Sequence, residues 1–368
     1  MKLVRSIYAI LAISLLLSSS SWSLYFFLTR YLANSMTLIL RYSVAELIPL
    51  VITPVICYLG EKLGYWFLGL VSILQVFEVG LLAIGIEYGY LFAAPASLGG
   101  VVLFATCFAI CFHLSGGRGL IYAKVTVSYV LGYSIAGFIG GFLLRLLGFQ
   151  GTVMLITVLN LIASLLLLYA TKRVRVRYSR CTLRSVVALR GELTLVLVLG
   201  LAGSELLWCG YARILRYIVP DPVLYCVVYS GLPPLLLSIV RPIAGYFVDR
   251  YGSAYVLELT ILSYLALTAV TLVIWYTYPL AALLLWLIPL STFFEVSAFT
   301  LLSRVYGAVN QAIAMSRYYC AYGIAGFIVL LTVGVSSDVN NVLLISVVVF
   351  CLAAVVLYLS IRYRRFRY

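Results

Sequence analysis

The sequence has 368 residues, of which 65% are hydrophobic and only 10% charged, and its mean hydropathy is +1.15. A soluble domain is about 45–50% apolar and about 25% charged, so this composition excludes an ordinary water-soluble protein. The formal charge of +14 could suit nucleic-acid binding, but the basic residues gather in short loops between apolar runs, as on the cytoplasmic side of membrane proteins.

Apolar runs of about 20 residues follow one another along the chain, and each is long enough for a helix that crosses the bilayer. Lipid offers no hydrogen bonds, so a span must be a helix or part of a closed barrel, and barrel strands would show shorter alternating segments. We therefore predict an all-α membrane protein with spans near residues 6–29, 36–59, 64–86, 90–112, 119–146, 151–171, 193–217, 222–247, 254–276, 279–302, 310–335 and 341–361.

The N-terminus resembles a secretory signal peptide, because Lys2 and Arg5 precede an apolar run that ends in the serines at 18–21. The apolar run nevertheless continues to Leu28, and an internal repeat begins at Trp22. We therefore expect a retained first helix.

The segment 172–192 is the longest polar stretch and carries seven basic residues against one acid, Glu192. We predict that it is a cytoplasmic linker between a six-helix bundle at 1–171 and another at 193–368. An even number of spans places both termini on one side, and the distribution of Lys and Arg assigns that side to the cytoplasm of a multi-pass cell-membrane protein.

Three segments recur in the same order, at a nearly constant offset of 186 to 189 residues: 22–32 with 208–218, 54–64 with 242–252, and 133–139 with 322–328. The repeat aligns Trp22 with Trp208. Six spans in each half give both halves the same orientation in the membrane. Such parallel repeats place a substrate site at the interface of the halves, near the bilayer midplane.

Two loops carry a related pattern of glycine, acid and base. The second copy reads Gly245-x-x-x-Asp249-Arg250-x-Gly252, and the first keeps Glu61, Lys62 and Gly64 but has Cys57 at the first glycine position. With the repeat, this loop resembles the signature of the major facilitator superfamily, and the resemblance covers essentially the whole chain. A glycine run at 132–141 is similar to an antiporter-type pattern without its proline. No arginine lies between Leu91 and Phe112, where many proton-linked members have one, which argues against drug–proton antiport.

The resemblance implies two pseudo-symmetric six-helix bundles and a secondary active transporter that moves a small solute by alternating access, with or without coupling to protons. The expected partners are lipid, the solute and protons, with no nucleic acid, and the protein is expected to be a monomer. The loop acids could meet a neighbouring helix N-terminus and latch one conformation shut, or the same loop residues could simply cap a turn. These loop residues are Glu61, Lys62, Gly64, Gly245, Asp249, Arg250 and Gly252.

An ionisable group at a helix centre costs roughly 2.5–3.5 kcal/mol on insertion scales, so each one is a functional candidate. Eight such residues occur: Arg41, Glu46, Glu78, Glu205, Arg241, Glu258, Glu295 and Arg317. We expect Arg241 to pair with Glu258 and Glu295 to pair with Arg317. Arg41 could snorkel to the interface. Glu78 is set aside, because its helix is peripheral in the family.

Glu205 and Glu46 are the leading candidates for a solute or coupling-ion site, because both lie on helices that line the central cavity in the family. Helical spacing places Trp208 on the same stripe as Glu205, and the repeat gives Ser19, Trp22 and Ser23 as counterparts in the first helix. The alternative for Glu205 and the serines is ordinary helix packing. Glu295 and Arg317 complete the candidate set.

A membrane-embedded enzyme is the next alternative, and the sequence argues against it. It has a single histidine, His113, and no paired-carboxylate motif, metal-ligand cluster or phosphate-binding loop. We therefore expect no catalytic residue, no bound metal and no cofactor. A further alternative is a sensor or scaffold with a transporter fold but no transport activity.

Overall fold

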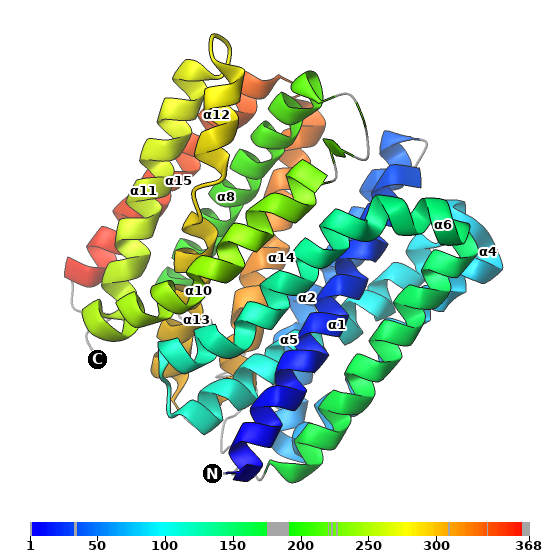
Figure 1. Cartoon of the computed structure of the whole chain (residues 1–368). Coiled ribbons are helices and arrows are strands. Elements are labelled where there is room, and N and C mark those ends of the chain that lie inside the picture. Colours follow the sequence, from blue (N-terminus) through cyan, green and yellow to red (C-terminus); the bar gives the residue numbers. More distant parts are fainter. Residues whose placement is uncertain are drawn as a thin grey trace.

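The computed structural model describes residues 2–32, 35–174, 191–219, 221, 224–225, 227–307, 310–336 and 338–362. Eleven helices in these ranges are long and apolar enough to cross a membrane. One of them, α6 (Gly119–Arg173), turns back at Gly148 (φ 65°, ψ −173°), a backbone conformation that favours glycine (Figure 1). Because α6 has 55 residues and turns at Gly148, it is long enough for two spans, and the described residues then hold the twelve spans that the sequence predicts.

The first bundle contains α1 (Lys2–Leu32), α2 (Met36–Leu63), α5 (Tyr90–Ser115) and both arms of α6. Its third span is divided into α3 (Tyr65–Val71), the 3-10 helix η1 (Ser72–Gly80) and α4 (Leu81–Tyr88). α1 packs along α6, and α5 packs against both α2 and η1.

The second bundle contains α8 (Gly191–Ile218), α11 (Ser253–Ile274), α14 (Gln311–Val335) and α15 (Val339–Arg362). Its second span starts with a π-helical turn, η2 (Val227–Gly231), and continues as α10 (Leu232–Tyr251). Its fourth span is divided into α12 (Pro279–Trp286) and α13 (Leu290–Tyr306). The division falls at Pro289, which has no N–H to donate and disfavours helical backbone in the residue before it.

The bundles meet through two helix pairs that the sequence repeat relates to each other. The first arm of α6 packs against α10, and α14 packs against α2. Both termini lie at one end of the molecule, and the bundles diverge toward the other end (Figure 1). The predicted fold of two pseudo-symmetric six-helix bundles is confirmed. The linker residues 175–190 lie outside the described part, so the boundaries at 171 and 193 remain a prediction.

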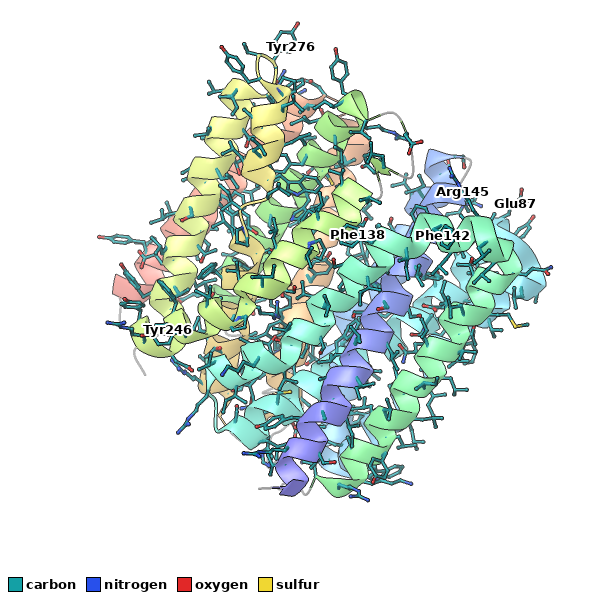
Figure 2. The ribbon with its side chains drawn as sticks, in the orientation of Figure 1. Glu87, Phe138, Phe142, Arg145, Tyr246 and Tyr276 are labelled. Carbon is teal, nitrogen blue, oxygen red and sulfur yellow. The ribbon has the colours of Figure 1, made fainter. Side chains whose placement is uncertain are left out.

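The outer surface of the helices carries apolar side chains, as a bilayer requires. Leu91, Met154 and Leu284 are each at least 60% exposed, although they lie within apolar spans. Glu87 and Arg145 both lie toward the end away from the termini (Figure 2).

Candidate functional site

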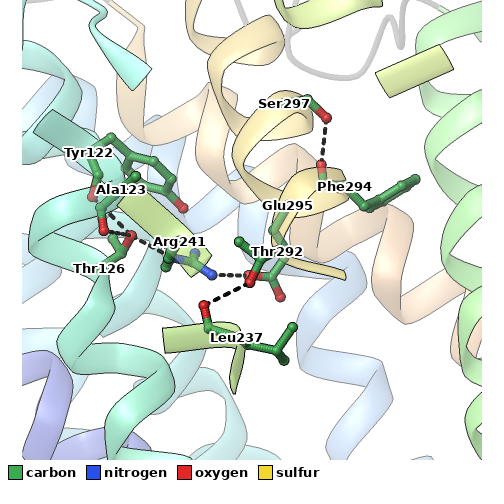
Figure 3. Close-up of polar contacts among 9 residues, drawn as sticks. All are labelled: Tyr122, Ala123, Thr126, Leu237, Arg241, Thr292, Phe294, Glu295 and Ser297. Carbon is green, nitrogen blue, oxygen red and sulfur yellow. Dashed lines mark hydrogen bonds and ion pairs between the residues drawn. The ribbon is translucent and has the colours of Figure 1, made fainter. Parts of the chain in front are cut away.

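A buried ion pair lies where the two bundles meet (Figure 3). Arg241 of α10 is only 1% exposed, and its Nη1 donates to Oε2 of Glu295 on α13 at 2.8 Å. Its Nε donates to Oγ1 of Thr126 on α6, in the other bundle, also at 2.8 Å. The guanidinium carbon lies 5.9 Å from the ring centroids of both Tyr122 and Tyr129. Arg241 therefore connects the bundles while its charge is balanced within the second bundle.

The predicted pairing of these charges was wrong. Arg241 pairs with Glu295, not with Glu258, because α10 packs mainly on α6 and α13 and only slightly on α11, which carries Glu258. Glu295 was expected to pair with Arg317, whose guanidinium instead lies 5.8 Å from the ring centroid of Tyr306. The sequence gives the depth of each charge but not the direction in which it points.

Aromatic rings from both bundles pack together beside the ion pair. Phe108 of α5 lies 5.1 Å from Phe299 of α13, and Phe299 lies 5.7 Å from Tyr122 of α6 and 4.2 Å from Tyr318 of α14. All four side chains are at most 5% exposed. This aromatic cluster joins α5 and α6 of the first bundle to α13 and α14 of the second.

Glu205 lies in the middle of α8 and is half-buried. The Tyr322 hydroxyl on α14 donates to its Oε1 at 3.1 Å. Within the described part of the chain, no ion pair involves Glu205. Glu205 is thus a carboxylate at the protein centre whose charge no described basic side chain balances.

Trp208, three residues after Glu205, belongs to a second group of aromatic side chains within the second bundle. Its ring centroid lies 5.3 Å from that of Trp286 and 5.7 Å from that of Tyr229, and Tyr229 lies 5.3 Å from Trp286. Trp208 and Trp286 also line a cavity at the break between α12 and α13. The sequence singled out Trp208 by its place in the repeat but did not indicate its aromatic partners.

The α1 residues that the repeat relates to the Glu205 stripe are Ser19, Trp22 and Ser23, and they differ in burial. Ser19 is fully buried, donates to the Leu15 carbonyl oxygen, and packs closely against Gly132 of α6. Trp22 and Ser23 are half-buried. The serine hydroxyls at 14, 18, 20 and 21 donate to groups on η1 and α6, so packing within the first bundle accounts for this serine cluster.

Glu46 of α2 is 6% exposed, and its carbonyl oxygen accepts from the Ser97 hydroxyl of α5 at 2.8 Å. This position within the first bundle neither assigns nor removes a role in solute binding. Glu46 therefore stays a candidate on the sequence argument.

Glu78, which the sequence did not favour as a site residue, belongs to a buried polar network. The 3-10 geometry of η1 aligns residues three apart, so Ser72, Gln75 and Glu78 share one face. Asn160 of α6 donates to Glu78 at 2.6 Å, Gln75 donates to Ser164 at 2.6 Å, and Ser164 donates to the Ser72 carbonyl oxygen at 3.0 Å. The three-residue spacing is visible in the sequence, and a 3-10 helix aligns such residues more closely than an α-helix does.

The two loop motifs make equivalent contacts between the bundles. Asp249 accepts hydrogen bonds from the backbone N–H groups of Gly119 and Leu120 at the start of α6, at 2.8 and 2.9 Å. Glu61 accepts from the N–H of Ala312 in the first turn of α14 at 2.9 Å. Each acid thus caps a helix of the other bundle, where the helix dipole favours negative charge.

The motif glycines serve the turn and the close approach of helices. Gly64 and Gly252 end α2 and α10 with φ of 102° and 93°, a region that residues with a Cβ rarely adopt. A Cβ at Gly245 would lie 2.8 Å from the backbone oxygen of Gly119, so glycine lets α10 approach α6. The basic residues point elsewhere: Arg250 donates to the Tyr246 hydroxyl, and Lys62 lies over the Tyr58 ring.

No protein-family model matches this sequence, and no curated protein matches it significantly. Solved structures do match in fold. A bacterial homologue of the iron transporter ferroportin, in an outward-facing state with soaked iron, superposes with a TM-score of 0.72 at 15% identity, over 95% of this chain and 98% of that one.

Two transporters with other solutes match almost as well. The human organic anion transporter MFSD10 has a TM-score of 0.68 at 14% identity, over 96% of this chain and 99% of that one. A variant of the E. coli fucose:proton symporter FucP has the same TM-score and identity, over 96% and 98%. The twelve passes, the paired interfaces and these three likenesses together show that this chain has the major facilitator fold.

Proposed function

We propose that the protein is a secondary active transporter that moves a small solute across the cell membrane by alternating access of its two bundles. The observation that carries this proposal is the position of the contacts between the bundles. The carboxylate caps and the aromatic cluster join the bundles at the end with the termini, while Glu205 and Tyr322 remain partly accessible at the centre.

These contacts have energies suited to a reversible switch. Each carboxylate cap contributes on the order of 1 kcal/mol, and the hydrogen bond from Arg241 to Thr126 contributes a similar amount. The ion pair between Arg241 and Glu295 lies within the second bundle, so it can stay intact while the bundles separate. Solute binding that favours one state by a few kcal/mol is then enough to shift the equilibrium.

Glu205 is the residue proposed to carry solute recognition or proton coupling. Its carboxylate is central and partly accessible, and Tyr322 holds it in place with a hydrogen bond. An ionisable group within a membrane span marks a solute or proton pathway by default. Trp22, Ser23 and Glu46 of the first bundle remain candidates to complete the site.

The structural neighbours support transport but name different solutes: iron, organic anions and fucose with protons. Their identities of 14 to 15% fix the fold and leave the solute open. The orientation with both termini in the cytoplasm is also part of this proposal, and it rests on the distribution of basic residues. In that orientation, the carboxylate caps that join the bundles lie on the cytoplasmic side.

Uptake into proteoliposomes, measured for a panel of solutes with and without an imposed proton gradient, tests the proposal. We expect saturable uptake of at least one solute. A cysteine pair at Gly119 and Val248, where an added Cβ at Gly119 would lie 3.2 Å from Val248 Cγ1, should stop uptake on oxidation and restore it on reduction. Folded protein that moves no solute under any gradient would favour the sensor or scaffold alternative.

A further inference from the structure

No ion pair within the described part of the chain balances the charge of Glu205. Glu205 and Glu295 supply two negative charges, and Arg241 supplies one positive charge that pairs with Glu295. Arg241 is also 1% exposed, so it is not available to an incoming anion. The accessible charge that remains at the centre is the carboxylate of Glu205.

One aromatic side chain contacts this carboxylate directly, because the Tyr322 hydroxyl of α14 donates to it at 3.1 Å. The ring of Tyr229 packs against the ring of Trp208, with 5.7 Å between their centroids. Trp208, three residues along α8, projects from the same side of the helix as Glu205. The faces of aromatic rings attract cations, most strongly for tryptophan.

A cavity next to these rings is lined by Trp286, whose hydrogen-bond donor no described residue satisfies. The break between α12 and α13 leaves space lined by Trp208, Tyr211, Tyr264, Trp286 and Ser291. Trp286 is 6% exposed, and its indole Nε1 has no hydrogen-bond partner among the residues that the structure describes. A buried donor left unpaired costs about 1–3 kcal/mol, so a ligand with an acceptor at this point would gain by binding there.

From these observations, we infer that the central site takes a small monovalent organic cation that also carries a hydrogen-bond acceptor. Its cationic group lies near the Glu205 carboxylate and the rings of Trp208 and Tyr229, and its acceptor receives the indole N–H of Trp286. A divalent metal needs several oxygen, nitrogen or sulfur ligands, whereas one unbalanced carboxylate and aromatic faces suit an organic monocation. This inference rests on the proposed function and names the class of its solute.

Choline tests each part of this inference, because it combines a quaternary ammonium with a hydroxyl group. Binding of radiolabelled choline to the purified full-length protein in detergent should be saturable. The neutral isostere 3,3-dimethyl-1-butanol should not compete, because it lacks the charge. Tetramethylammonium should compete about three- to tenfold more weakly than choline, because it lacks the acceptor.

Two variants and one control locate the site. Glu205→Gln should weaken choline binding at least tenfold, and Trp286→Phe should weaken choline binding but leave tetramethylammonium binding unchanged. Glu258→Gln, which alters a carboxyl group on α11 away from this site, should change neither. An unchanged elution volume and melting temperature would show that each variant is folded, and Glu205→Asp should retain part of the binding.

The inference is overturned if choline does not bind, if the neutral isostere competes as well as choline, or if Glu205→Gln binds choline normally. It is also overturned if Fe²⁺ or an organic anion stabilises the protein through Glu205 while choline does not. Its failure is distinguishable from failure of the proposed function. Uptake of a neutral or anionic solute would support the transport function and contradict the organic-cation inference. Choline binding without movement of any solute would support the inference and contradict the transport function.

Discussion

The pairing of Arg241 with Glu295 leads to a quantitative prediction about stability. Breaking a buried ion pair by removing one partner typically costs about 3–5 kcal/mol, because the other charge is left uncompensated. The Glu295 side chain is 25% exposed, so water can partly solvate it after Arg241→Met, and we expect a cost near the lower limit, about 3 kcal/mol. Arg241 is 1% exposed, so Glu295→Gln should cost more, about 4 kcal/mol.

The double variant should lose much less stability than the sum of the two single variants. Replacing both members of a buried pair by neutral groups removes the uncompensated charge, so the coupling free energy should be at least about 2 kcal/mol. The assay is unfolding of the purified protein by sodium dodecyl sulfate in mixed micelles, followed by circular dichroism.

A matched cycle supplies the control for this prediction. Arg241→Met combined with Glu258→Gln should show coupling below about 0.5 kcal/mol, because these side chains lie on helices with little mutual contact. Coupling to Glu258 that equals or exceeds the coupling to Glu295 would refute the reasoning. The reasoning would also be refuted if the losses of stability from the single variants at Arg241 and Glu295 simply add in the double variant.

Three further predictions concern packing, the loop contacts and topology. Gly137→Ala should lower the melting temperature clearly more than Gly140→Ala. An added Cβ at Gly137 would clash with the backbone of Ser230 and Gly231 in the other bundle, whereas at Gly140 it would lie 3.2 Å from the movable side chain of Leu24. Equal effects of the two variants would contradict this packing. Asp249→Asn should weaken the cap on α6 by about 1 kcal/mol and increase thiol labelling of a cysteine placed in the closed interface, and unchanged labelling would count against a latch. Single cysteines at Ser179 and Asn340 should react with a membrane-impermeant reagent from opposite sides, and labelling from the same side would exclude the twelve-pass topology.

Several features could be predicted from the sequence because they depend on local properties. Each span is recognisable from its own residues, since the bilayer requires about 20 apolar residues in a row. The repeat related Glu61 to Asp249 and Gly64 to Gly252, and the structure gives each pair equivalent contacts and backbone angles. A turn that needs positive φ selects glycine wherever the chain folds, so the loop motif can be read without a structure.

The partners of the buried charges could not be read in this way. Which helix faces Arg241 depends on the rotation and packing of α10. The prediction paired Arg241 with Glu258 on the next helix along the chain, whereas its partner is Glu295. The role of Glu78 depends on the 3-10 geometry of η1, which follows from contacts with α5 and α6 rather than from helix propensity.

Tertiary structure alone decided the surroundings of Glu205. Its depth in α8 was predicted from the sequence, but its hydrogen bond with Tyr322 joins residues 117 positions apart. The cavity beside Trp286 lies where Pro289 interrupts a span that hydropathy shows as continuous. Hydropathy measures how well a residue tolerates lipid, whereas a site is made by the directions in which side chains from several helices point, and packing fixes those directions.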